Sequence, residues 1–253
     1  MSIVATLARA TLIEAVRNRL LWLILVVVVA AFGMAQFLDQ VAIAESREIQ
    51  AALIAAPLRI AAVFIVAVFV ITSMVRESSE KVTELLLSLP APRSTYFFGK
   101  FAGYAAVATI LALLCALPLA LLAKLPGLAM WTASLLCELL IVTAMSLFCV
   151  LTLSQVVPAL AAVAGFYMLS RSMAAMQIIA AAPLHELTLG DRVIKGVVET
   201  IAFLLPAIDG MTQTAWLVGA EPSGASLTVF GQTVIYLVLI CSAALFDLYR
   251  KNF

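Results

Sequence analysis

The chain has 253 residues, of which 65% are hydrophobic and only 11% are charged, and its mean hydropathy is +1.16. Soluble globular domains carry about 45 to 50% apolar residues, so this excess excludes a water-soluble fold. The 15 basic and 14 acidic residues nearly cancel, which excludes the strongly basic surface by which nucleic-acid-binding proteins hold phosphates.

The N-terminal segment has the pattern of an amphipathic helix. Over residues 3–19, apolar side chains recur every three or four positions, and the charged and amide side chains lie elsewhere around the helix: Arg9, Glu14, Arg17 and Asn18. This pattern is typical of a helix in the cytoplasmic headgroup layer, so we expect residues 1–19 to form an interfacial helix. The first apolar run lacks a convincing small-residue cleavage site after it, and we expect it to be retained.

Six apolar runs after this helix are long enough to cross about 30 Å of hydrocarbon. They cover residues 20–38, 58–75, 101–123, 131–153, 157–182 and 227–248. The sequence therefore predicts an all-α, polytopic membrane protein with six transmembrane helices, folded as a single domain over residues 1–253. An even number of spans places both termini on the same side.

The distribution of basic residues predicts the orientation, because Lys and Arg resist translocation. One side carries Arg9, Arg17, Arg19, Arg76, Lys81, Arg93, Lys100, Arg250 and Lys251. The other side carries Arg47, Arg59, Lys124, Arg192 and Lys195, and Arg171 falls within a span. We therefore expect a bacterial cytoplasmic membrane protein with both termini in the cytoplasm. Trp22 and Trp131 fall at span ends, where indole rings favour the interface.

The cytoplasmic connection, residues 76–100, is charged at first, then leucine-rich, and then interrupted by Pro90 and Pro92. Proline ends a helix because it lacks the amide donor and restricts the residue before it. The segment therefore predicts a short amphipathic helix, a sharp turn and a second helix that enters the third span. Its leucines are costly to leave in water unless they rest on lipid or fill a partner's groove, and we expect them to bind a partner.

This segment resembles the loop between the first two core spans of ABC-2 type export permeases. The residues that carry the resemblance are Glu77, Glu80, Glu84, Leu85, Leu86, Pro90, Pro92, Arg93, Gly99 and Lys100. The chain departs from the family pattern at Lys81, Val82 and Thr83, where the family usually has Gly, Thr and Leu. The predicted order of elements also resembles that of the family: an amphipathic N-terminal helix, six spans, both termini inside and a helical outer hairpin before the last span. The Pro-x-x-Asp element within residues 204–209 is similar to one found in several such permeases.

The resemblance implies that residues 77–89 form a coupling helix in a cleft of a separate cytoplasmic ATPase. The implied contact residues are Glu77, Glu80, Glu84, Leu85, Leu86, Leu87, Leu89 and Pro90. It further implies ATP and Mg in that partner, no cofactor in this chain, and two permease copies, expected as a homodimer, with two ATPases. The chain itself is not expected to be an enzyme, because its only Gly-Lys, Gly99-Lys100, has Ser94 and Phe101 where a P-loop needs Gly and Ser or Thr.

Two ionisable residues fall inside predicted spans. Glu138 lies about seven residues into the fourth span and Arg171 about thirteen into the fifth, which places each roughly 10 Å below the outer surface at 1.5 Å per residue. Matching depth on consecutive antiparallel helices predicts an ion pair, since each charge alone is costly in hydrocarbon. The pair either lines a translocation path or joins two helices internally.

The long outer connection, residues 183–226, contains two apolar pieces, 193–205 and 208–218, separated by Pro206. Neither piece is long enough to span, so the sequence predicts a helical hairpin that either dips into the outer leaflet or lies on the surface. Nearby, Met168, Met173, Met176 and His185 allow a soft-metal path, although apolar packing is the more common use of Met, and we expect no metal site.

Two other functions fit a polytopic membrane protein. A secondary transporter needs coupling-ion sites and usually inverted repeats, and the sequence displays neither. A membrane assembly scaffold without catalysis would use the long outer connection as a docking surface. Besides the ATPase and the second copy, membrane lipid is the remaining expected partner.

Overall fold

The computed structural model describes residues 3–18, 20–41, 47–80, 92–181, 189–218 and 225–250, and within these ranges every element is a helix. The elements are α1 (Ile3–Arg17), α2 (Leu20–Val41), α3 (Arg47–Ser79), α5 (Arg93–Ala120), α6 (Leu125–Leu153), α7 (Val156–Ala181), α8 (Leu189–Leu204), α9 (Ile208–Met211), the 3-10 helix η1 (Ala215–Val218) and α10 (Ala225–Arg250). This confirms the predicted all-α class.

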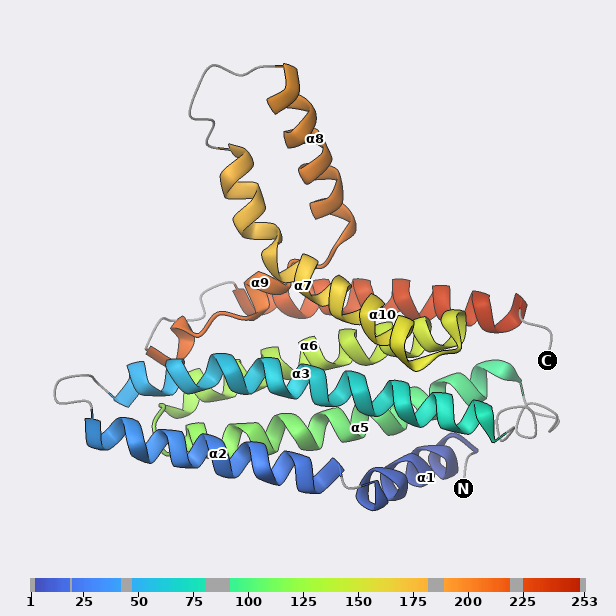
Figure 1. The fold of residues 1–253 in the computed structure, drawn as a ribbon, viewed down its shortest axis with the longest axis horizontal. Helices are drawn as coiled ribbons and strands as arrows, with labels where there is room; N and C mark the ends of the chain where they lie inside the picture. Colours follow the sequence, from blue (N-terminus) through green and yellow to red (C-terminus); the bar gives the residue numbers. More distant parts are fainter. Residues whose placement is uncertain are drawn as a thin grey trace.

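The long helices form a bundle (Figure 1). α2, α3, α5, α6 and α10 run side by side, and the central helix α6 packs against α3, α5, α7 and α10. Within the described ranges, five helices are long and apolar enough to cross a membrane, or six if the bent pair Val4–Arg17 and Trp22–Phe37 forms one span. These properties are compatible with a multi-pass membrane protein, in agreement with the coarse prediction.

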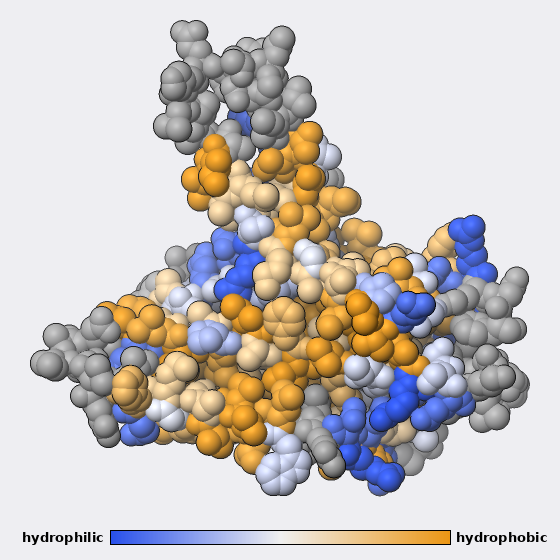
Figure 2. All heavy atoms as spheres, viewed as in Figure 1, coloured by the Kyte–Doolittle hydropathy of each residue, from blue (hydrophilic) through white to orange (hydrophobic). Residues whose placement is uncertain are grey.

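One end of the bundle carries α1, the C-terminal end of α3, the N-terminal end of α5 and the C-terminal end of α10 (Figure 1). Apolar side chains cover the middle of the face drawn in Figure 2, and hydrophilic side chains gather toward this same end. We call it the terminal end of the bundle. The segment that resembles a permease loop connects α3 to α5 here.

α1 and α2 are separate helices with a bend of 61° between them. α1 does not lie apart from the bundle, however, because it packs along α5 at two glycines. A Cβ atom added at Gly99 would lie 2.8 Å from Leu7 Cδ1, and one added at Gly103 would lie 2.7 Å from Thr11 Cβ. The G-x-x-x-G spacing therefore provides the groove that α1 occupies.

α3 begins eleven residues before the predicted apolar run and passes through Pro57 without ending. Its 33 residues correspond to roughly 50 Å at 1.5 Å per residue, longer than the hydrocarbon layer alone requires. As a result, Arg59, which the distribution of basic residues assigns to the outer side, lies well inside the helix and is fully buried. It is an interior residue of the bundle and not a loop residue.

The described part of the connection between α7 and α10, residues 189–218, is largely helical, but it is not a simple hairpin. α8 and the last turns of α7 stand away from the bundle together (Figure 1), whereas α9 and η1 pack onto it through Ile208, Met211, Trp216 and Leu217. The second apolar piece is thus two short elements instead of one helix. α9 and η1 lie along α6 and α3, because this position removes the four apolar side chains from solvent.

Candidate functional site

Arg59 is a fully buried charge in the described part of the chain, and five contacts hold its guanidinium. Nη1 donates to Glu138 Oε2 at 2.7 Å and to the Met211 carbonyl at 3.0 Å. Nη2 donates to Ser134 Oγ at 3.0 Å and, at 3.4 Å, to the Trp131 carbonyl. The guanidinium carbon also lies 5.0 Å from the centre of the Trp131 ring, within cation–π range. We call Arg59, Trp131, Ser134, Glu138, Tyr167 and Arg171 the buried cluster.

Glu138 joins this arginine to α7. Its Oε2 accepts from Arg59, and its Oε1 accepts from the Tyr167 hydroxyl at 2.8 Å. Arg171, one helical turn after Tyr167, donates from Nη1 to the Tyr167 oxygen at 2.8 Å. The predicted direct contact between Glu138 and Arg171 is therefore replaced by a relay through Tyr167, and the basic partner of Glu138 is Arg59.

This geometry favours an internal link between helices over a lining of a translocation path. The side chains of Arg59 and Glu138 are 1% and 0% exposed, and their bonds connect α3, α6, α7 and α9. Arg59 also satisfies the last carbonyl of α9, a group that the helix cannot pair by itself. Trp131, predicted to lie at the interface, is fully buried beneath this arginine, whereas Trp22 is exposed.

Sequence reasoning identified Glu138 and Arg171 but missed Arg59, Ser134 and Tyr167. One signal was available, because Arg59 is the only charged residue between Glu48 and Arg76 in an otherwise apolar segment. An ionisable residue in such a segment requires a partner. The bulk of the apolar run lies after Arg59, however, so the residue also matched the pattern of a span boundary.

A second polar cluster lies at the terminal end of the bundle and joins α1, α3 and α5. Ser73 Oγ donates to Glu14 Oε1 at 2.6 Å, and the Tyr104 hydroxyl donates to Ser73 Oγ at 2.9 Å. Arg76 forms an ion pair with the same Glu14 oxygen, and Lys100 forms one with Glu77 Oε1. We call Glu14, Ser73, Arg76, Glu77, Lys100 and Tyr104 the loop-base cluster.

The loop-base cluster holds both helices that flank residues 81–91. Arg76 and Glu77 occupy the end of α3, while Lys100 is 3% exposed on α5. At the start of α5, Arg93 Nη1 donates to the Leu248 carbonyl at 2.9 Å and to the Tyr249 carbonyl at 3.3 Å. These two carbonyls lie in the last turn of α10, where a nearby cation interacts favourably with the negative end of the helix dipole. The two helices joined by residues 81–91 are therefore each held at their ends, α3 by α1 and α5 by α10.

The predicted ATPase-coupling residues divide into two groups. Glu77 faces Lys100 within the bundle, so its carboxylate is engaged inside this chain, whereas Glu80 is exposed. The remaining residues lie outside the described part of the structure: Glu84, Leu85, Leu86, Leu87, Leu89 and Pro90. Gly99 and Lys100 of the motif both act within this chain. Gly99 leaves room for α1, and Lys100 forms an ion pair with Glu77 on α3.

We expect Lys100→Met to lower the free energy of unfolding by about 1–3 kcal/mol, because it leaves the largely buried Glu77 carboxylate without its donor. Equilibrium unfolding in mixed micelles of a mild detergent and dodecyl sulfate, followed by circular dichroism, measures this change. Lys195→Met is the matched control, since its pair with Glu199 spans 3.9 Å with both side chains at least half exposed. Equal losses of unfolding free energy in the two variants would contradict a stabilising role for the pair between Lys100 and Glu77.

The residues that allow a soft-metal path in the sequence differ in their burial. Met173 is buried, Met168 and Met176 are partly exposed, and His185 lies outside the described residues. No group of three His, Cys, Asp or Glu side chains in the part of the chain described here is close enough to hold an ion. The cysteines are buried, unbridged core residues: Cys115, Cys137, Cys149 and Cys241.

Comparison with models of known protein families gives no match to this chain, and comparison with curated protein sequences gives none either. The features of the chain that bear on its function are therefore the two polar clusters and the segment between α3 and α5.

Proposed function

We propose that the chain is the membrane-spanning permease subunit of an ATP-driven exporter of the ABC-2 type. The observation that carries the proposal is the position of the leucine-rich segment 81–91, which links two long helices fixed at their bases. Arg76 pairs with Glu14 on one side, and Arg93 binds the carbonyl end of α10 on the other. A connection anchored in this way transmits a push as movement of whole helices.

In this proposal the terminal end of the bundle faces the cytoplasm of a bacterium, and α2 is the first of six spans. A separate ATPase binds residues 77–89, chiefly through Leu85, Leu86, Leu87 and Leu89. Glu77 serves the proposed coupling indirectly, because its ion pair with Lys100 fixes α3 to α5. ATP and Mg belong to the partner.

The proposed assembly contains two copies of this chain. Apolar side chains on the projecting part of α7 and on α8 support it: Ile178, Ile179, Val197 and Leu204 are 69%, 75%, 52% and 77% exposed. In Figure 1, α8 and the last turns of α7 project from the bundle. Exposed apolar area of this kind fits contact with lipid or with a second subunit.

We expect an ATP-hydrolysing chain to copurify with the tagged full-length protein in mild detergent and to be lost from the double variant Leu86→Asp/Leu87→Asp. A carboxylate at each position would be desolvated without a partner in an apolar groove. The measurement is nucleotide hydrolysis in the purified complex together with the ratio of the two chains.

Leu125→Asp is the control, because Leu125 is 80% exposed at the opposite end of the bundle and receives the same substitution. It should retain the ATPase. A complex without nucleotide hydrolysis, or an ATPase that remains bound to the double variant, would overturn the proposal. Ion-driven transport by the isolated, reconstituted chain would support a secondary transporter instead.

A further inference from the structure

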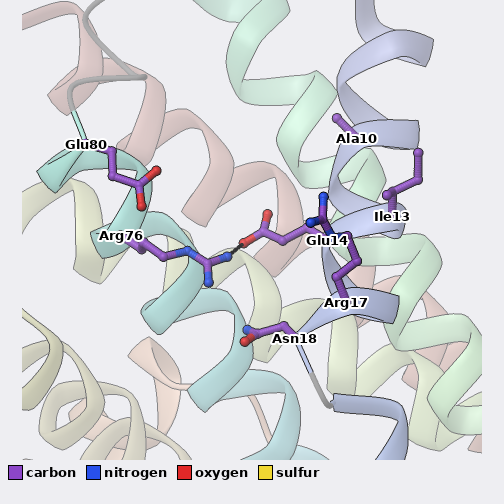
Figure 3. A pocket seen from close by; sticks show the side chains of 7 residues that line it. All are labelled: Ala10, Ile13, Glu14, Arg17, Asn18, Arg76 and Glu80. Atoms are coloured by element: carbon purple, nitrogen blue, oxygen red, sulfur yellow. Dashed lines mark hydrogen bonds and ion pairs between the residues drawn. The ribbon is translucent and has the colours of Figure 1, made fainter.

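A polar pocket of about 480 Å³ lies at the elbow where α1 ends, against the last turns of α3 (Figure 3). Glu14 and Arg17 of α1, and Asn18 directly after it, form one side of its polar lining. Arg76 and Glu80, from the end of α3 and the residue after it, form the other side. We call it the elbow pocket. Its volume is within the range of small-molecule sites, and its position is at the terminal end of the bundle.

An apolar groove of about 330 Å³ lies beside the elbow pocket. Asn18 lines both cavities, so they meet at the junction between α1 and α2. The other groove residues are Leu23 on α2 and Phe64, Ile65, Val68, Phe69 and Thr72 on α3. A polar cavity that adjoins an apolar one matches a ligand with a charged head and a hydrocarbon tail.

One row of side chains on the α3 segment runs through both cavities. Glu80, Arg76, Thr72, Val68 and Phe64 follow one another at intervals of four residues, so they form a row that winds gradually around the helix and changes from charged to polar to apolar. The twelve residues from Arg76 to Phe64 cover roughly 18 Å at 1.5 Å per residue. One leaflet of the hydrocarbon core is about 15 Å thick, so the length suits one acyl chain.

The charges of the elbow pocket are balanced and partly satisfied. Glu14 already accepts from Ser73 and pairs with Arg76, as the dashed line in Figure 3 shows for the second contact. The pocket then has a basic group in Arg17, remaining donors on Arg76, and an acidic group in Glu80. Guanidinium groups bind phosphate through paired N–H donors, and a carboxylate binds an ammonium group.

We propose that the elbow pocket and the apolar groove bind one phospholipid with an ammonium headgroup, such as phosphatidylethanolamine, from the leaflet at the terminal end. Arg17 and Arg76 hold the phosphate, Glu80 holds the ammonium, and an acyl chain occupies the groove along Val68. The balanced lining favours a zwitterionic headgroup over a purely anionic one. The inference depends on the membrane location in the proposed function, but not on an ATPase.

The test is native mass spectrometry of the delipidated full chain titrated with phosphatidylethanolamine, phosphatidylglycerol or phosphatidylcholine. We expect one phosphatidylethanolamine per chain, bound more tightly than the other two lipids. Arg17→Gln should weaken this binding about tenfold, because one charge-assisted contact to phosphate is lost. Arg9→Gln is the matched control, since Arg9 is exposed on the same helix and outside the pocket.

A second pair of variants tests the groove without changing any charge. Val68→Trp fills the apolar groove and should weaken binding, whereas Val234→Trp, on an exposed position of α10, should not. Millimolar inorganic phosphate should not displace the lipid, which separates a lipid site from a free-phosphate site. Equal binding by the Arg17 and Arg9 variants, or tighter binding of phosphatidylglycerol, would overturn the proposal. A chain that binds the lipid but no ATPase would refute only the proposed function.

Discussion

Arg59→Met is expected to lower the free energy of unfolding by about 3–5 kcal/mol, the largest effect of any substitution proposed for this chain. The variant leaves the Glu138 carboxylate, which is 0% exposed, without its cation, and it leaves the Met211 carbonyl without its donor. Taking a charge out of water is costly, and the attraction of the opposite charge is the compensation that the substitution removes.

The double variant Arg59→Met/Glu138→Leu separates this explanation from simple loss of packing. Removing both charges eliminates the uncompensated carboxylate, so the double variant should be more stable than Arg59→Met alone. Equilibrium unfolding in mixed detergent micelles provides the comparison, with Arg250→Met as a control at an exposed position. A double variant that is less stable than either single variant would show that the ion pair is not the source of the effect.

Gly103→Ala is expected to destabilise the chain by about 1–3 kcal/mol, because α1 lies against this position. The added Cβ would be 2.7 Å from Thr11 Cβ and 3.1 Å from the Ala8 Cα, which is backbone and cannot rotate away. α1 would have to move off α5, and the ion pair between Glu14 and Arg76 would be disturbed with it. The unfolding midpoint measured by circular dichroism reports the loss.

Gly165→Ala is the matched control, and the two changes should have opposite signs. Gly165 is also inside a helix, but within the described residues no neighbouring helix or side chain lies within 4 Å of a Cβ added there. Alanine favours the helix over glycine by about 0.5–1 kcal/mol, so this variant should be as stable as the original chain or more stable. A stabilising effect of Gly103→Ala would contradict the close approach of α1.

The sequence determined the helical class. It predicted six long apolar runs, and the described residues form five helices that are long and apolar enough to cross a membrane. Runs such as 131–153 are too long and too apolar to form anything but buried or membrane-spanning helices, since an unpaired backbone is not tolerated in hydrocarbon. Local patterns of this kind depend only on neighbouring residues, which explains why they could be interpreted from the chain alone.

The partners of the buried charges were decided by the tertiary structure. Glu138 was predicted to pair with Arg171 because both residues have the same depth on consecutive helices. Depth does not specify rotation about the helix axes, and that rotation turns Tyr167 toward Glu138. It also leaves the carboxylate facing Arg59 on α3, 79 residues earlier in the chain.

The same distinction applies to the segment that resembles a permease loop. Its residue types indicated a charged start, a leucine-rich middle and a Gly-Lys end, but they did not reveal which residues face inward. The structure assigns Glu77 and Lys100 to each other and Gly99 to α1, because three helices approach closely at that point. Sequence patterns specify each helix and its apolar face, whereas the packing of distant helices decides which polar groups meet.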